Sequence, residues 1–580
     1  MFDDYPNLSS IISYLDEYLQ KTHPLCFGSN PAHPFLGLKR SKILHDNLWG
    51  TNRFTWHELA IIDSPIFQRL RYIHQTGLAY QVYMSAHHTR FEHSLGVTIV
   101  ASRIFEKIMD HQGNLVHSMV KAIWPDLQDG WPAISRLKQE LRLAALLHDT
   151  GHSLFSHTSE YVYSKLRLLI DASNELTKLT GKKKGCGEVL SFCLASTSSI
   201  KDLINNARPR LLGDPASDEH VGEIDFRNVA LMIVGRAIHP FLQFLGDIIS
   251  SSFDVDKLDY LLRDATNAGL PLQYDLQRYL FSVRLEKDIL ADGQNQLMEL
   301  YSNFQLASLE RKKGYGRHGY PYYEAYRLKL PTKALNTIEQ IVICKLMLFS
   351  YIYHHQKVRA SEGLLQRLLE RIVDGWRKKG FSDQEILGKF FDLTDPALYN
   401  GISESQDEIS ETIRYRLIYR LLPRETFSIA GSCASHADRL PLQDFMIQFM
   451  DEDKREIKIR DIELDIGKEL IKLRDDLGDD PMDALLKAGV WFDVPNQPKF
   501  EDIDDIVLGG GTTVSIPLPE IFPIGEWTDA YKHYRYKMRI FCFSEYVDLV
   551  KRVAKNVLKA KIKIMDNDFY DKILKRRVED

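Results

Sequence analysis

Four segments of this chain repeat apolar residues every three or four positions, which is the spacing of a helix with one buried face. The first begins near Val97, the second ends at Leu147, the third begins near Val255 and the fourth lies around Ile341. Helices of this kind are stable only when their apolar faces cover one another. The spacing therefore predicts a mainly α-helical core that is large enough to enclose a site.

Polar side chains accompany these apolar segments at four positions: His93, His148, Asp149 and Asp256. We expect all four to lie on helices and to converge inside the bundle, where an unpartnered imidazole or carboxylate is costly to bury. A divalent metal (Mn, Fe, Mg, Zn or Ni) bound by nitrogen and oxygen donors removes that cost and activates water for hydrolysis. For any one of the four, a hydrogen-bonded core residue is the simpler interpretation. Their order along the chain favours a metal site.

Three stretches around these residues resemble the HD superfamily of metal-dependent phosphohydrolases. They are Ile61–Val97, Leu143–His157 and Ser251–Ala265, and a weaker fourth is Tyr351–Leu365. Within that superfamily the chain is most similar to the deoxynucleoside triphosphate (dNTP) triphosphohydrolases. The resemblance implies a helical HD-domain core and hydrolysis of dNTPs to deoxynucleoside and inorganic triphosphate.

Spacing assigns proton transfer beside the metal to His152, which would share a helix face with the metal ligands. His157 and Glu160 follow within two turns and are further catalytic candidates, with a structural hydrogen-bond network as the alternative. The resembling enzymes carry a catalytic histidine before a glutamate, where this chain has Gly187. We therefore expect His152 or a residue such as His220 to supply the proton, or the activity to be weakened.

The resemblance further implies a substrate site with basic residues for the triphosphate and polar or aromatic residues for the sugar. Basic side chains stabilise phosphoryl oxygens as charge develops on them, and an aromatic ring can pack on a sugar. Each residue also has a simpler explanation: a basic residue can be a solvated surface cation, and an aromatic residue can pack in the core. The substrate-binding candidates are Arg90, Lys257, Lys345, Tyr260, Asp264, Gln75 and Tyr353.

A second nucleotide site is implied at a boundary between subunits, with base-reading residues Asp63, Gln68 and Arg71 and the phosphate-contacting Lys42. The carboxylate and the guanidinium suit the edge of guanine. This site would bind a GTP or dNTP activator and drive assembly of a homo-oligomer, either a dimer or a tetramer. The alternative is a helix-packing motif with a buried Arg–Asp pair.

Changes of pattern along the chain suggest the domain boundaries. We interpret residues 1–40 as an N-terminal extension, 41–375 as the HD core and 376–580 as a mixed α/β lobe for regulation or assembly. Residues 171–227 are richer in Lys, Ser, Gly and Asp and are interpreted as an insertion with some helix. Within it, the GKKKG run at Gly181–Gly185 predicts a loop.

Three further elements are predicted from periodicity. The fourth apolar helix is expected to continue toward Arg371, the alternation of Ile457–Leu464 predicts a strand, and Ser544–Ala560 predicts an amphipathic helix.

The composition argues against several other classes of protein. A formal net charge of −5 over 580 residues gives no general attraction for nucleic acid or anionic membranes. Six cysteines without a CxxC pair indicate neither a disulfide framework nor a cysteine zinc site. The N-terminus is acidic and the apolar runs are interrupted by Arg236 and Lys345, so we expect no signal peptide, no membrane span and a cytoplasmic location.

Two other functions stay open from the sequence. One is an HD phosphohydrolase or phosphodiesterase that acts on another nucleotide, such as an alarmone or a cyclic dinucleotide. The other is a nucleotide sensor with weakened catalysis, which Gly187 would explain. Depletion of dNTPs would also suit antiviral defence, a biological role that residues alone do not address.

Overall fold

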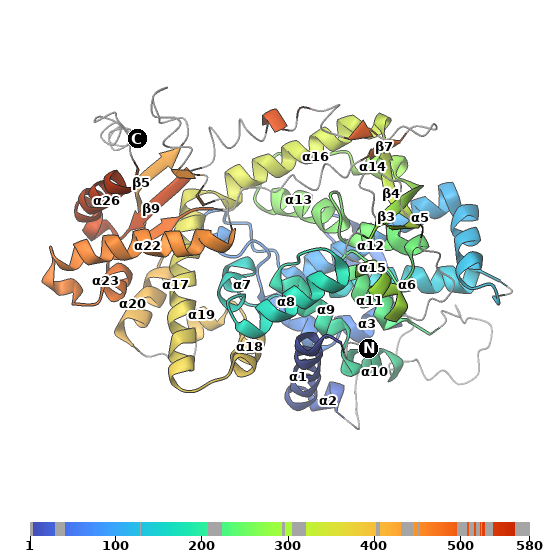
Figure 1. Ribbon diagram of the computed structural model, residues 1–580, viewed down its shortest axis with the longest axis horizontal. Coiled ribbons are helices and arrows are strands. Elements are labelled where there is room, and N and C mark those ends of the chain that lie inside the picture. The colour runs from blue at the N-terminus through green and yellow to red at the C-terminus, as the bar shows by residue number, and fades with distance from the viewer. Residues whose placement is uncertain are drawn as a thin grey trace.

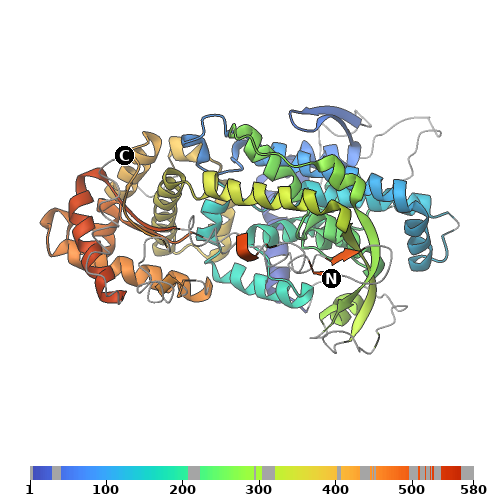
Figure 2. The same cartoon turned by 90° about the horizontal axis from the view of Figure 1, so that it is seen from above.

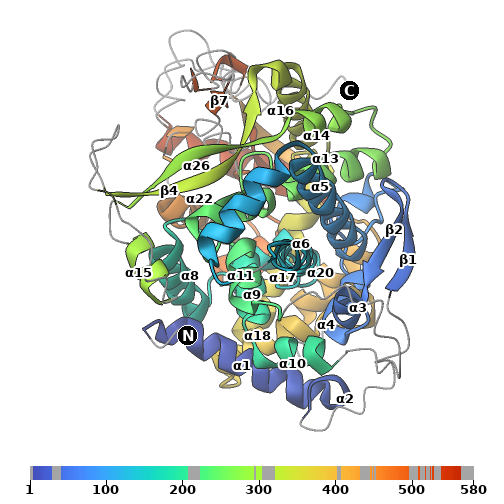
Figure 3. The same cartoon turned by 90° about the vertical axis from the view of Figure 1, so that its right-hand side faces the viewer.

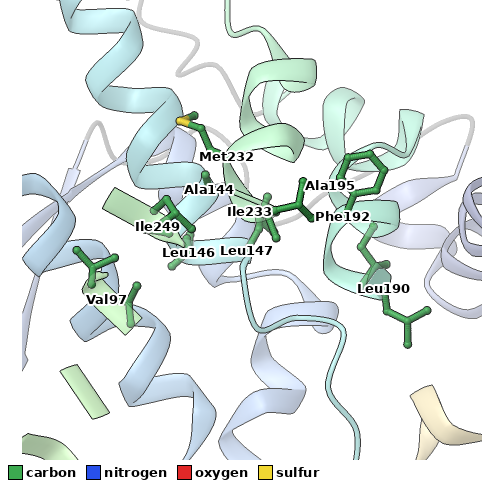
Figure 4. Close-up of a cluster of buried hydrophobic side chains, with 14 of the residues drawn as sticks. Val97, Ala144, Leu146, Leu147, Leu190, Phe192, Ala195, Met232, Ile233 and Ile249 are labelled. Atoms are coloured by element: carbon green, nitrogen blue, oxygen red, sulfur yellow. The ribbon is translucent and has the colours of Figure 1, made fainter. Parts of the chain in front are cut away.

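Two long helices, α5 (Arg90–Ile123) and α6 (Trp131–Leu147), pack against each other and organise the core of the computed structural model. Their predicted apolar faces are buried, including Val100 and Ile104 of α5 and Leu137 and Leu141 of α6. Helices α9, α11 and α3 also contact α6 (Figure 3). Figure 4 shows how side chains of α6, α9 and α11 meet around Leu147 and Ile233. The chain is therefore mainly helical, as the periodicity predicts.

The structure describes most of the chain, in segments separated by gaps. The described residues are 4–28, 41–127, 129–206, 223–292, 296–303, 312, 321–401, 407–430, 445–446, 448–449, 452–495, 507–509, 516–517, 523, 525–527 and 537–562.

Figure 1 shows the helices of the core in chain order. Besides α5 and α6 they are α1 (Pro6–Thr22), α2 (Pro24–Phe27), α3 (Trp56–Ile62), α4 (Pro65–Gln68), α7 (His157–Tyr163), α8 (Arg167–Thr180), α9 (Cys186–Ala195), α10 (Ser198–Asn206), α11 (Phe226–Ile233), α12 (Gln243–Ile249), α13 (Val255–Asn267), α14 (Leu276–Ser282), α15 (Gln296–Asn303), α16 (Leu335–Leu348), α17 (Gln356–Lys378), α18 (Asp383–Asp392), α19 (Ala397–Asn400) and α20 (Glu408–Ile418).

Two small sheets border the helical core. The antiparallel pair β1 (Ser41–Asp46) and β2 (Gly50–Thr55) precedes α3. The second sheet has the strand order β3-β4-β7-β8, in which β3 (Arg284–Ala291) and β4 (Tyr322–Pro331) are antiparallel and β4 is parallel to β7 (Val507–Gly509). Strand β8 (Ile516–Pro517) pairs with β7, so a segment from the C-terminal part of the chain completes a sheet of the core.

The helices and strands of the C-terminal lobe, in orange and red, lie together at one end of the molecule (Figure 2). The lobe has its own sheet and its own apolar core. Its strands run antiparallel in the order β5 (Arg424–Ala430), β9 (Lys537–Cys542), β6 (Trp491–Asp493). The lobe helices are α22 (Glu452–Ile471), α23 (Pro481–Ala488) and α26 (Val547–Lys561). This arrangement confirms a mixed α/β lobe, and α26 confirms the predicted terminal helix.

Two predictions of secondary structure are wrong. The predicted strand Ile457–Leu464 is part of helix α22, because Ile462, Ile466 and Leu470 repeat at helical spacing and are buried. The fourth apolar helix does not continue unbroken toward Arg371. It ends after α16 in a π-helical turn, Phe349–Tyr353, and α17 starts a new helix.

The segment interpreted as an insertion, 171–227, is helical and buried where the structure describes it. It contains most of α8 and all of α9 and α10, and Leu176 belongs to the main core. Figure 4 shows Phe192 of α9 in this core. The GKKKG run of the segment forms the predicted loop between α8 and α9. This loop borders the cavity described below.

One helical stretch, Thr332–Tyr353, is long and apolar enough to cross a membrane by length and composition alone. Core helices of water-soluble proteins meet the same criterion. Here the stretch packs α16 against α13 and α14, and Ile338 and Ile341 belong to the main core.

Helix α13 packs against α5 at a glycine. A Cβ atom on Gly96 would lie 2.1 Å from Asp259 Oδ1 and 2.3 Å from Arg263 Nη2. Asp259 and Arg263 are one turn apart on α13 and form a buried ion pair, with 2.7 Å between Oδ2 and Nε. The absence of a side chain at Gly96 therefore allows this pair to contact α5 directly.

We predict that Gly96→Ala lowers the free energy of unfolding by roughly 1–3 kcal/mol, because the added methyl group overpacks this contact. Urea denaturation followed by circular dichroism measures the change. Gly113→Ala on the same helix is the matched control, since its Cβ would meet only Met109 Cε, at 3.4 Å. An unfolding midpoint of Gly96→Ala equal to that of the wild type would contradict the packing described.

Candidate active site and metal centre

Local structure brings the predicted metal ligands to one point. Thr89 and Glu92 form a capping box that starts α5, which places His93 in the first turn. Asp254 caps α13 by accepting a hydrogen bond from Lys257 N at 2.9 Å, which places Asp256 in the first turn of that helix. Helix α6 ends at Leu147, so His148 and Asp149 lie just beyond its C-terminus rather than on the helix.

The four side chains meet as the sequence predicts. His93 Nε2 lies 3.0 Å from Asp256 Oδ1 and 3.6 Å from Asp149 Oδ2. His148 Nε2 lies 3.6 Å from Asp149 Oδ1 and 4.0 Å from Asp256 Oδ1. Donor atoms of His93, His148 and Asp256 all lie within 4.8 Å of one another.

Hydrogen bonds fix which imidazole nitrogens face this point. His148 Nδ1 donates to the Ala145 carbonyl at 2.7 Å, and His93 Nδ1 donates to Asp259 Oδ2 at 2.8 Å. Both Nε2 atoms are buried and face the carboxylates of Asp149 and Asp256. Two lone pairs and two carboxylates that surround one point fit a divalent metal, and the Asp259–His93 bond is the outer contact that metal-binding histidines usually make.

The electrostatics of the cluster favour a cation. Burial opposes charge on His93, yet Asp256 and Asp259 raise the pKa of this imidazole to about 10. Burial would raise the pKa of Asp149, but the Arg90 guanidinium and the surrounding imidazoles hold it well below its usual range. The carboxylates are therefore ionised and attract positive charge to the space between them.

Asp259 is the main residue that sequence reasoning missed. Its carboxylate is fully buried and accepts hydrogen bonds from His93, from Arg263 and from the Trp49 indole. Arg263 also donates to Asp46 Oδ2 at 3.0 Å. The spacing of Asp256 and Asp259, one helical turn apart, was the available signal, but the role of Asp259 depends on partners far away in the sequence.

His152 reaches the site by a different route from the one predicted. The chain leaves α6 and turns, so His152 is not helical, and Arg69 holds the turn by donating to the carbonyls of Thr150 at 2.6 Å and His152 at 2.7 Å. His152 Nε2 lies 3.4 Å from Asp149 Oδ1. Burial, followed by the nearby Arg90, lowers the pKa of His152 to about 3, so its ring is neutral.

His157 and Glu160 form a pair in the first turn of α7. His157 Nδ1 lies 2.8 Å from Glu160 Oε2, and 77% of the His157 side chain is exposed. Although burial opposes charge on the ring, the hydrogen bond to Glu160 raises the pKa of His157. Glu160 also accepts from Gly187 N at 2.8 Å. With His152 these two residues could also hold a metal, but the hydrogen bonds of Glu160 already account for their arrangement.

Gly187 occupies the position where the resembling enzymes carry a histidine, and here it serves as a packing surface. A Cβ atom on Gly187 would lie 2.4 Å from His152 Cε1. The His152 ring therefore fills the space that a side chain at residue 187 would need. His220, the other candidate replacement, lies outside the described residues.

Strained backbone follows the metal ligands. Phe155 and Ser156 have positive φ angles of 50° and 56°, a conformation that costs about 1–3 kcal/mol per residue and clusters at functional sites. Ser156 Oγ donates to the His74 carbonyl at 2.6 Å and accepts from Arg90 Nε at 2.8 Å. Asp395 accepts from Phe155 N at 2.6 Å. These bonds hold the turn that leads to His157.

The metal ligands open into a cavity of about 1230 Å³ between the core and the C-terminal lobe. Arg90 lines it. Its Nη2 is buried and has no hydrogen-bond partner among the described residues, while Nη1 donates to Asp149. Lys257 is held by Asp254 at 2.7 Å and by the Ser251 carbonyl at 2.8 Å. The predicted substrate residues that line the cavity are Arg90, Lys257, Tyr260, Asp264, Gln75 and Tyr353.

Asp264 is hydrogen-bonded to Tyr353, another candidate for the sugar site, and to His88. Its Oδ1 accepts from His88 Nε2 at 2.8 Å and its Oδ2 accepts from the Tyr353 hydroxyl at 2.5 Å. The buried Gln75 Oε1 has no hydrogen-bond partner in the part of the chain that the structure describes. Lys345, the remaining candidate, lies on α16 and does not line the cavity.

The four residues of the predicted regulatory site lie on neighbouring elements: Lys42 on β1, Asp63 at the end of α3, and Gln68 and Arg71 on and after α4. Lys42, Asp63 and Arg71 are exposed. The alternative of a buried Arg–Asp pair is wrong. Arg71 instead lies over the Phe91 ring, 3.5 Å from its centroid, and donates to Gln68 Oε1 at 2.9 Å.

The family model and the relatives that match this chain are consistent with the site described above. The model of the HD domain matches residues 90–208. The chain is 27% identical over 383 residues to an uncharacterized protein of Methanocaldococcus jannaschii, an alignment that covers 66% of this chain and 59% of that protein. It is 28% identical over 269 residues to the deoxynucleoside triphosphate triphosphohydrolase SAMHD1 homolog of Dictyostelium discoideum, which covers 46% of this chain and 44% of that protein.

Human deoxynucleoside triphosphate triphosphohydrolase SAMHD1 is 30% identical over 263 residues, which covers 42% of this chain and 36% of that protein. The chain thus spans about half the length of the curated relatives it matches. A crystal structure of a hypothetical protein from Aquifex aeolicus superposes with a TM-score of 0.54 at 20% identity and covers 90% of this chain, so the two share a fold. These matches confirm the resemblance: residues 90–208 carry an HD domain, and deoxynucleoside triphosphate triphosphohydrolases are among the relatives of the chain.

Proposed function

We propose that this chain hydrolyses dNTPs to deoxynucleosides and inorganic triphosphate at the metal centre. The observation that carries the proposal is the cavity, in which metal donors, phosphate-binding cations and the Asp264–Tyr353 pair line one space. Similarity to dNTP triphosphohydrolases over less than half of the chain supports this substrate class. The whole set suits a ligand with a triphosphate at one end and a sugar at the other.

The metal ligands would be His93, His148, Asp149 and Asp256. A divalent metal bound there would act as a Lewis acid toward phosphate and lower the pKa of a bound water. Arg90 holds Asp149 ionised, and its Nη2, which has no partner among the described residues, would be the group to donate to a phosphate oxygen.

His157 is the better placed proton donor of the two candidate histidines. Glu160 stabilises its imidazolium, and the ring is exposed to the cavity, so His157 can protonate the leaving oxygen. His152, whose pKa is lowered to about 3, takes up a proton poorly and is better suited to hydrogen-bond a phosphate oxygen. His157, supported by Glu160, would then supply the proton that the sequence resemblance assigns to a histidine at the position of Gly187.

We predict that the purified protein with Mn²⁺ or Mg²⁺ converts dNTPs to deoxynucleoside and intact triphosphate, as product analysis by ion-exchange chromatography would show. Chelation should abolish turnover, and Asp149→Ala should reduce it by more than about 100-fold, because the metal loses a ligand. Lys178→Ala, on the exposed side of α8, is the control and should retain activity. Monophosphate or diphosphate products would instead indicate a different HD phosphohydrolase, and no turnover would indicate a sensor.

We predict that Gly187→Ala reduces turnover about tenfold or more, because its methyl group displaces the His152 ring. Steady-state kinetics measures the loss. Gly375→Ala in α17 is the control, since a Cβ there meets nothing within 4 Å. Wild-type turnover in Gly187→Ala would show that the position of His152 is unimportant for catalysis.

We also propose the regulatory site that the sequence resemblance implies. In it, a nucleotide would be bound by Lys42, Asp63, Gln68 and Arg71. The structure offers a connection to the metal centre, because Arg71 lies over Phe91, the residue next to Arg90. A ligand that moves Arg71 would therefore act on the start of α5.

We predict that GTP or a dNTP increases the sedimentation coefficient of the protein through homo-oligomerisation. The double variant Asp63→Ala/Arg71→Ala should lose this response, because it removes the base-reading groups, while Arg167→Ala, exposed on α8, should keep it. Sedimentation that is the same with and without nucleotide would argue against the activator site.

A further inference from the structure

The cavity extends beyond the metal centre along a polar wall. This wall is the segment Ser250–Ser252, which joins α12 to α13 and lines the cavity. At one end of it Lys257 Nζ donates to the Ser251 carbonyl at 2.8 Å. At the other end Lys184 Nζ, in the GKKKG loop, donates to Ser250 Oγ at 2.6 Å. The wall therefore leads from the metal-bearing helix α13 to the GKKKG loop.

Six basic residues line the cavity at this far end: Lys182, Lys183, Lys184, Arg236, Arg327 and Lys329. Lys184 is neutralised by Glu188, with 2.9 Å between Nζ and Oε1. Arg327 is neutralised by Asp247, with 2.6 Å between Nε and Oδ2. Lys329 pairs with Asp288, with 2.7 Å between Nζ and Oδ2, and Lys183 is exposed to solvent. Among the described residues of this group, Lys182 and Arg236 are therefore the two buried or partly buried cations that are left over.

Neither Lys182 nor Arg236 forms an ion pair with any carboxylate in the described part of the chain. Arg236 is only 9% exposed, and its Nε donates to the Thr180 carbonyl at 2.7 Å. Asp247 attracts both cations from a longer range, but its carboxylate is already paired with Arg327. Lys182 is partly buried in the loop directly after α8. The two side chains belong to different elements that meet at the cavity.

This arrangement is costly without a ligand. Burial, together with the charge of Arg236, lowers the pKa of Lys182 to about 8. Burial likewise lowers the pKa of Arg236. Charged groups taken out of water are stable when an opposite charge pairs with them. An anion in the cavity would provide that pairing for both residues at once.

We propose that Lys182 and Arg236 form a second anion site in the same cavity, separate from the metal centre, which binds a phosphate group of a polyphosphate ligand. Two positive charges without an ion pair in the described part of the chain, one of them a guanidinium whose terminal nitrogens bond to no described residue, match the charge and hydrogen-bonding pattern of phosphate. The site is built from Lys182 and Arg236 and involves none of the metal ligands, so it does not depend on the proposed hydrolysis. Its ligand is either free inorganic triphosphate or the phosphate chain of a nucleotide.

Isothermal titration of the full chain with sodium tripolyphosphate, and separately with dATP, tests this site. A chelator is present throughout, so that binding through a metal makes no contribution. We expect tripolyphosphate to bind the wild type and Lys182→Met to bind it about tenfold or more weakly, because a charge-assisted hydrogen bond is lost. Lys182→Arg should restore binding. Lys178→Met, a nearby exposed lysine that does not line the cavity, should bind like the wild type.

The two ligands distinguish the two sources of phosphate. If Lys182→Met weakens tripolyphosphate binding alone, the site holds free triphosphate. If it weakens both ligands, the site holds the phosphates of a nucleotide. Equal binding of tripolyphosphate by Lys182→Met and wild type, or no binding by the wild type, would overturn the proposal. Because binding is read without turnover, failure of the hydrolysis experiment leaves this result interpretable.

Discussion

A buried carboxylate, that of Asp259, holds the metal-binding part of this molecule together. It fixes the ring of His93 through Nδ1, pairs with Arg263 and accepts from the indole of Trp49. It thereby joins α5, α13 and the β1–β2 connection at one point. Gly96 makes the contact possible by removing a side chain from the surface of α5. The ligand geometry rests on this contact, because His93 and Asp256 come from the two helices that it joins.

Electrostatic balance explains the rest of the site. Arg90 is almost fully buried and pairs with Asp149, so the cluster contains a fixed cation beside the space where a metal would lie. The same arginine is bonded to Ser156, one of two residues with strained backbone. Glu160, one helical turn beyond Ser156, pairs with His157. One connected set of hydrogen bonds and ion pairs thus runs from the metal ligands to the proposed proton donor.

The sequence predicts which polar side chains gather at one point, because each stands on or directly after a helix with an apolar face. His93, His148, Asp149 and Asp256 meet as expected. The helix predicted for His152 is wrong, because α6 ends before His148 and Arg69 stabilises a turn instead. Local alternation was also misleading at Ile457–Leu464, where the buried positions follow a helical period only when a longer window is considered.

Other features depend on contacts that no local pattern contains. The role of Asp259 requires Trp49, more than two hundred positions away. The fit of His152 against Gly187 requires α9 to pack beside the turn after α6. The unpaired cations of the cavity become visible only when the GKKKG loop, Arg236 and β4 are seen together. In each case tertiary packing decides which polar residues find a hydrogen-bond or ion-pair partner within the protein and which are available to a ligand.

The central claim is that a divalent metal is bound between α5, the turn after α6 and α13. Anomalous diffraction from crystals of the protein grown with Mn²⁺ tests it most directly. We expect one strong anomalous peak within roughly 2.0–2.3 Å of His93 Nε2 and His148 Nε2 and of carboxylate oxygens of Asp149 and Asp256. A peak at His152, His157 and Glu160 instead, or no peak at either cluster, would contradict it.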